Sequence, residues 1–159
     1  MKRQGERAQG SAPMAAGRLI ILALAGGVLM FGVVAVAIGP LKTEGDLQLE
    51  HVYLPLFLAV LAPGVFMASA LFAANGSKRL KDKLPEAKVQ AKEGLIPQAL
   101  IGSWIMGAAC FESLGLLAGI VLLLGGHWSG YAGIVIGLIG ILSHLPTSEK
   151  VERAIQHAG

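Results

Sequence analysis

Four long apolar segments constrain this chain more than any other feature of its sequence. They cover residues 19–38, 52–74, 97–124 and 128–145. A bilayer core is about 30 Å thick, so a helix that crosses it needs about 20 mostly apolar residues. All four segments are close to that length or longer. We therefore predict an all-α membrane protein whose four transmembrane helices form two antiparallel hairpins.

The composition agrees with this class of protein. Of the 159 residues, 54% are hydrophobic and only 14% are charged. A soluble domain of this size has a large surface for its volume and needs more polar side chains than that. We expect a disordered basic N-terminal tail over residues 1–17, one transmembrane bundle over residues 18–146, and a short cytoplasmic C-terminal tail over residues 147–159.

The positions of lysine and arginine predict the orientation of the helices. These residues gather in the N-terminal tail and in the loop between the second and third segments, whereas the turn between the last two segments has none. Positively charged flanks stay in the cytoplasm, so both termini are expected inside (N-in/C-in). Trp128 and Tyr131 then lie at the outer interface as aromatic anchors. The expected location is the bacterial inner (cytoplasmic) membrane, with multiple passes.

The first apolar segment has a second interpretation. It ends in "AVA", so it could be a signal peptide cleaved after Ala37. Its apolar run is longer than the usual signal-peptide core of about 7–15 residues, which favours a retained span. Cleavage would leave three spans in the same orientation.

The basic loop over residues 77–93 carries six of the 13 lysine and arginine residues. It is interpreted either as a contact for anionic lipid headgroups or as an ordinary cytoplasmic loop. The net charge of +3 comes from short flanks rather than from a continuous basic face, so no nucleic-acid partner is expected. The sequence shows no phosphate loop, catalytic triad or haem motif, and Cys110 stands alone. We therefore predict no enzyme, no cofactor and no metal site.

Glu112 is the candidate functional residue. It is the one acidic or basic residue other than histidine between Gly94 and Ser148, and it falls near the middle of the third segment. A charged residue at the bilayer centre costs about 2.5–3.5 kcal/mol on insertion scales. We therefore expect a neutral, protonated carboxyl that needs a hydrogen-bond partner. The expected partner is the Ala59 carbonyl, because Pro63 removes the helical hydrogen bond to that group.

Small residues at helical spacing predict how the last two helices pack. On the third segment the stripe is Trp104, Ala108, Glu112, Gly115 and Gly119; on the fourth it is Gly130, Gly133, Gly137, Gly140 and His144. Small residues let membrane helices approach closely, so we expect these two stripes to face each other. His144 is interpreted as a favourable positive group at a helix C-terminus. Ser69 and Ser113 are expected to bond to carbonyls of their own helices.

Two stretches resemble known families. The mid-membrane acid followed by a final span that ends in "LPTSEKVER" is similar, over residues 96–155, to a widespread family of small bacterial four-span membrane proteins with no assigned function. Members of that family usually have glycine where this chain has Ser113. "FESLGLLAGIVLLL" also resembles the carboxylate helix of rotary-ATPase proteolipid c subunits, a resemblance that implies a proton-binding role for Glu112.

Three functions remain open from the sequence. The favoured one is a structural or accessory membrane component that self-associates or joins a larger complex through its Gly/Ala helix faces. The alternative is a proton- or cation-binding subunit that uses Glu112. The third is a carrier of a small molecule or lipid.

Overall fold

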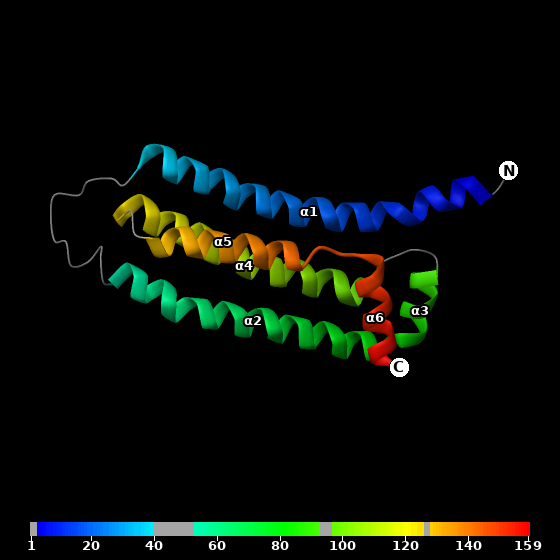
Figure 1. Cartoon of the computed structure of the whole chain (residues 1–159). Coiled ribbons are helices and arrows are strands. Elements are labelled where there is room, and N and C mark those ends of the chain that lie inside the picture. The colour runs from blue at the N-terminus through cyan, green and yellow to red at the C-terminus, as the bar shows by residue number, and fades with distance from the viewer. Residues whose placement is uncertain (1–2, 40–52, 93–96, 126–127) are drawn as a thin grey trace.

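The computed structural model describes residues 3–39, 53–92, 97–125 and 128–159 of the chain. Over these residues the protein consists of helices and contains no strand (Figure 1). The helices are α1 (Arg3–Ile38), α2 (Leu54–Asp82), α3 (Leu84–Lys92), α4 (Gln98–Gly125), α5 (Trp128–Ser143) and α6 (Ser148–Ala158).

Three of these helices are long and apolar enough to cross a membrane. The qualifying stretches are Ala15–Ile38, Pro55–Asp82 and Gln98–Leu124. α5 has 16 residues, so it is shorter than the usual span. The chain bends by 70° between α5 and α6, and this pair is a fourth candidate if it counts as one broken span. The described part of the chain therefore has three to four candidate spans.

Two helices extend beyond their predicted limits. α1 begins at Arg3, so residues 3–17, which were expected to be disordered, are helical. Arginine, glutamine and alanine in this stretch are good helix formers, so nothing in their propensities stops the helix. α2 continues past residue 74 to Asp82, because Gly76 packs against Ser103 of α4 rather than ending the helix.

α4 is the central helix of the bundle. It packs against α5, α2 and α1, whereas α1 and α2 lie on opposite sides of the α4–α5 pair (Figure 1). The pair α1 and α2, which was expected to form a hairpin, makes at most marginal direct contact. α1 and α2 are therefore not packed neighbours although they follow each other in the chain. α4, the third apolar segment, contacts α1, α2 and α5 and so holds the bundle together.

The glycine stripe of α5 lies directly on α4. A Cβ atom on Gly137 would be 2.9 Å from the Cα of Gly115, and one on Gly130 would be 2.8 Å from the carbonyl oxygen of Ala118. Real Cβ atoms essentially never approach other atoms so closely, so these positions exclude any side chain unless the helices separate. The two helices thus touch backbone to backbone, as small-residue stripes in membrane helices allow.

The small-residue stripe of α4 faces a different helix from the one expected. A Cβ atom on Gly119 would be 2.6 Å from the Phe31 ring of α1, and one on Gly115 would be 2.6 Å from a methyl group of Val28. α5 instead occupies the face of α4 that carries Phe111 and Ala118. Gly115 is shared by the two faces, because a central helix needs small residues on more than one side.

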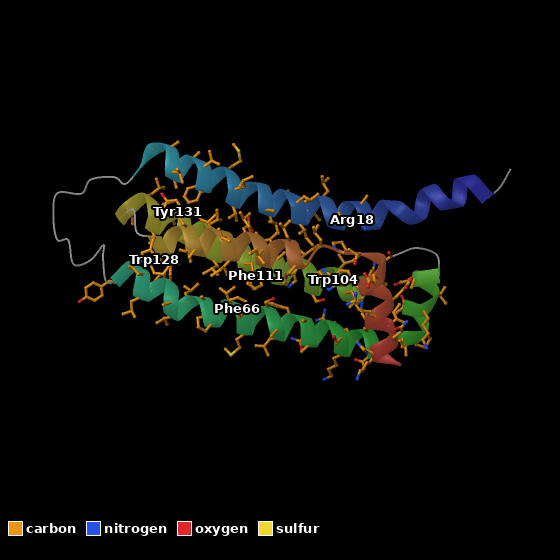
Figure 2. The ribbon with its side chains drawn as sticks, viewed as in Figure 1. Arg18, Phe66, Trp104, Phe111, Trp128 and Tyr131 are labelled. Carbon is orange, nitrogen blue, oxygen red and sulfur yellow. The ribbon has the colours of Figure 1, made fainter. Side chains whose placement is uncertain are left out.

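The two ends of the bundle differ in their charged and aromatic residues. The end that carries both termini, α3 and α6, here called the basic end, contains Arg18 and the basic last turn of α2 (Figure 1). Trp128 and Tyr131 lie at the opposite end, which we call the aromatic end (Figure 2). At the basic end, α3 and α6 cover a small apolar cluster formed by Leu80, Ala87, Leu100 and Val151.

The "PTSEK" element ties the basic end together. The Lys150 ammonium donates to the Ser143 carbonyl at 2.6 Å and to the Leu145 carbonyl at 3.1 Å, which satisfies groups left free at the end of α5. The Arg18 Nε donates to the Pro146 carbonyl at 2.9 Å, so α1 is held to the same turn. The Thr147 hydroxyl accepts from the backbone N–H of Lys150 and caps α6.

A Gly137→Ala substitution tests the backbone contact between α4 and α5. The added methyl group meets the Gly115 backbone, so we expect a loss of about 1–3 kcal/mol in the free energy of unfolding, as for other overpacked sites. Gly64→Ala is the matched control, because a Cβ atom there meets nothing within 4 Å. Unfolding in detergent measures both. Equal stability of the two variants would contradict the close approach.

A Lys150→Met substitution tests the link between α5 and α6. It keeps most of the apolar stem but removes two hydrogen bonds from a charged donor, so amides of residues 143–151 are expected to exchange about tenfold faster with solvent deuterium. Lys78→Met, on the exposed surface of α2, is the control and leaves this segment unchanged. Unaltered exchange in the Lys150 variant would show that the cap contributes nothing to local stability.

Candidate functional site

Glu112 lies at the contact between α4 and α1. It is near the middle of α4, and Gly27 is near the middle of the apolar stretch Ala15–Ile38 of α1. A Cβ atom on Gly27 would be 3.8 Å from the Glu112 Oε1. Both helices thus place this contact halfway along their apolar lengths. The carboxyl is half-buried, because the absent side chain of Gly27 leaves it partly uncovered.

The hydrogen bond expected between Glu112 and α2 is not formed. Within the part of the chain that the structure describes, the Glu112 carboxyl has no hydrogen-bond partner, and Ala59 and Pro63 are exposed on α2. The face of α4 toward α2 carries Gly107 and Phe111. Position 112 lies about 140° around the helix from position 107, which turns the carboxyl toward α1 instead.

A second polar site lies between α2, α4 and α5, nearer the basic end. The Ser69 Oγ on α2 is 3.2 Å from the His144 Nε2, which follows the last turn of α5. The His144 Nδ1 is 2.8 Å from the Gly140 carbonyl oxygen and 3.2 Å from the Ser143 Oγ. Ser69 is only 7% exposed. The serine therefore bonds across the bundle rather than only to its own helix, and the histidine does more than complement a helix terminus.

The hydrogen bonds of His144 assign its proton. A carbonyl oxygen can only accept, so the Nδ1 that faces Gly140 carries the hydrogen. In the neutral ring the Nε2 is then an acceptor, and the Ser69 hydroxyl donates to it. In the charged ring the Nε2 donates and the hydroxyl oxygen accepts. Rotation of one hydroxyl therefore satisfies both protonation states of the histidine.

A glycine makes room for this pair. A Cβ atom on Gly107 would clash with the His144 imidazole and lie 3.2 Å from the Ser69 Oγ. The Phe111 ring covers another side of the imidazole, with centroids 5.7 Å apart, and meets Phe66 edge-on at 5.1 Å. Figure 2 shows Phe66 and Phe111 directed toward each other between α2 and α4. Ser69 is thus buried, whereas His144 is half-buried.

The Ser69 hydroxyl of this pair is buried. A serine hydroxyl next to a histidine whose other nitrogen is fixed has the geometry of an activated nucleophile. Here the hydroxyl is buried close to the Cβ position of Gly107 and to the imidazole. The pair therefore forms a hydrogen bond that joins α2 to the end of α5 beside α4.

One sequence signal pointed to this site. His144 continues the stripe of Gly133, Gly137 and Gly140, so its side chain faces α4 like the glycines before it. The sequence gives no comparable signal that Ser69 of α2 lies level with His144, because the register between two helices is set by packing.

The remaining predicted site residues are dispersed. Ala108 is fully buried in the bundle core, and the interfacial anchors Trp128 and Tyr131 are 72% and 50% exposed at the aromatic end. Cys110 is half-buried in α4. Across residues 3–39, 53–92, 97–125 and 128–159, no group of three histidine, cysteine or acidic side chains is arranged to hold a metal ion.

Comparison with known proteins gives no relative for this chain. No family model, no curated protein sequence and no solved structure matches it.

A double-mutant cycle tests the tie between α2 and α5. Ser69→Ala combined with His144→Phe is expected to show a coupling energy of about 0.6 kcal/mol, the average for hydrogen bonds between membrane helices, and at most about 1.7 kcal/mol. Ser113→Ala is the matched control, since the Ser113 hydroxyl donates to the Ala109 carbonyl of its own helix, and its coupling to His144 is expected to be near zero. Equal coupling in the two cycles would rule out a direct bond between Ser69 and His144.

Proposed function

We propose that the protein is a four-span component of the bacterial cytoplasmic membrane with both termini in the cytoplasm. Two features support this orientation. The basic residues, both termini and the amphipathic helix α6 share one end of the bundle, whereas Trp128 and Tyr131 occupy the other. In this arrangement α5 crosses the membrane as a short span and α6 turns away from it along the cytoplasmic surface. The resemblance to small four-span bacterial proteins agrees with this reading.

Within that membrane, the protein acts as a structural or accessory component rather than as an enzyme. The observation that carries this proposal is the Glu112 carboxyl, which lies at mid-bundle without a hydrogen-bond partner among the described residues. A polar group in hydrocarbon is costly until it is bonded. A helix from a second copy or from another membrane protein, docked beside Gly27, would supply the missing acceptor.

The docking surface of this proposal differs from the Gly/Ala faces that the sequence favoured. Gly115 and Gly119 of α4 already contact α1, and Gly137 and Gly140 of α5 already contact α4. The partner instead meets the outer sides of α1 and α4 around Gly27 and Glu112. Gly26 and Gly27 of α1 leave room for a close approach. A Cβ atom on Gly26 meets nothing within 4 Å, and Gly27 is exposed.

Ion binding by Glu112 is the second candidate. The same uncovered carboxyl at mid-bundle supports it, because a proton or cation can reach an acid that is not already bonded. A carrier function is supported only by an apolar groove of about 560 Å³ between α2 and α5, lined by Leu58, Ala62 and Ile136 among others.

Three substitutions of Glu112 separate these functions. In the accessory role, Glu112→Gln keeps the assembly because an amide still donates a hydrogen bond, and Glu112→Leu disrupts it. In the ion-binding role, wild-type Glu112 and Glu112→Asp react with dicyclohexylcarbodiimide, and Glu112→Gln does not. Native size in mild detergent and carbodiimide labelling are the two measurements.

The control for these substitutions is Ser113→Leu, an exposed neighbour on α4 that keeps the carboxyl. If Glu112→Leu leaves the native size of the wild-type assembly unchanged, the accessory contact at Glu112 is wrong. If the Glu112 carboxyl of the wild type does not react with the carbodiimide, the ion-binding role is wrong.

A further inference from the structure

A groove on the surface of α2 and α4 near the basic end combines polar and apolar walls. It encloses about 250 Å³ and is lined on α2 by residues 72, 75, 76 and 79 and on α4 by residues 99, 102, 103 and 106. Both sets follow helical spacing, so the groove runs along the crossing of two antiparallel helices. The close approach of Gly76 to Ser103 forms its floor.

The lining of the groove changes in polarity along the helix axis. Arg79 lies nearest the basic end, Asn75 follows one turn deeper, and Phe72 lies deepest on α2. Met106 is the deepest lining residue on α4 and is largely exposed. Seven residues separate Arg79 from Phe72, which is about 10 Å of helix. That distance exceeds the headgroup layer of about 5–8 Å on each side of a bilayer, so in the proposed orientation, with Arg79 among the headgroups, the groove ends in hydrocarbon.

The polar end of the groove has unused hydrogen-bond donors. Neither the Arg79 guanidinium nor the Asn75 amide has a partner among the described residues, and Arg79 is the one charged residue in the lining. A guanidinium matches the geometry of phosphate oxygens and bonds to them in pairs. Ser103 adds an oxygen acceptor only, because its hydroxyl already donates to the Leu100 carbonyl.

Arg79 also borders a second hollow of about 420 Å³ at the start of α3. There the acids Asp82 and Glu86 offset the charges of Arg79 and Lys83, so that hollow offers an anion no net attraction. The groove between α2 and α4 is therefore the more suitable site for a negatively charged group.

We propose that this groove binds one anionic phospholipid of the leaflet at the basic end. Its phosphate bonds to Arg79 and Asn75, and the start of one acyl chain lies over Gly102 toward Phe72 and Met106. Gly102 is exposed and has nothing within 4 Å of its Cβ position, which leaves space for the chain. The lipid thus occupies a defined site on α2 and α4 rather than the basic loop as a whole.

Native mass spectrometry of the purified protein with added phosphatidylglycerol or phosphatidylcholine tests this proposal. Wild type is expected to bind one phosphatidylglycerol about tenfold more tightly than phosphatidylcholine, because the choline ammonium offsets the phosphate charge and weakens its bond to Arg79. Arg79→Gln abolishes this preference by removing the charge, and Gly102→Leu weakens binding of phosphatidylglycerol by filling the groove. Neither change touches a bonded or closely packed atom, so both variants are expected to unfold at the wild-type temperature.

Two controls match these variants in chemistry. Lys81→Gln removes one charge from the same helix turn outside the groove, and Gly64→Leu adds the same side chain to an open position of α2; both should bind like wild type. Equal effects of controls and variants, or equal binding of the two lipids by wild type, would show nonspecific annular lipid and overturn the proposal. Displacement of phosphatidylglycerol by inorganic phosphate or glycerol 3-phosphate at matched concentrations would also overturn it, because the acyl chain would then contribute nothing.

Discussion

The close approach of backbones around α4 is the contact on which the rest of the structure depends. In hydrocarbon there is little hydrophobic force between helices, so association comes from van der Waals contact and hydrogen bonds. Glycine and alanine on two faces of α4 let α5 approach on one side and α1 on the other. Phe111 then fills the space between α2, α4 and α5, where it meets both Phe66 and His144.

Hydrogen bonds between helices add to the contacts that the small residues allow. The Ser69–His144 bond joins α2 to α5 at the depth where Gly107 leaves room, and Arg18 and Lys150 satisfy carbonyls at the end of α5. None of the buried side-chain nitrogen or oxygen atoms in the described ranges lacks a partner. The half-buried Glu112 differs from them, since it is partly uncovered and has no bond to any residue that the structure describes, and this difference makes it the candidate contact for a molecule outside the chain.

The sequence was sufficient for the apolar helices, because the length and hydropathy of a span follow from bilayer thickness. The periodicity of Gly130, Gly133, Gly137 and Gly140 also indicated that one face of α5 approaches another helix. Periodicity alone does not identify the neighbour, however. The stripe through Gly115 and Gly119 lies against Val28 and Phe31 of α1 rather than against α5. Likewise, Glu112 faces Gly27 because packing sets the rotation of α4, a quantity that no single segment encodes.

The helices that are synthesised first are not the ones that pack against each other first. α1 and α2 emerge first from the ribosome but have almost no contact surface in common, so neither gains its packing partner until α4 has been made. The last helices then fix the first, since Pro146 and Lys150 follow α5 and hold both its end and α1. A chain halted before the "PTSEK" element would therefore contain nearly all of its apolar helices and still lack the closure that makes them a single bundle.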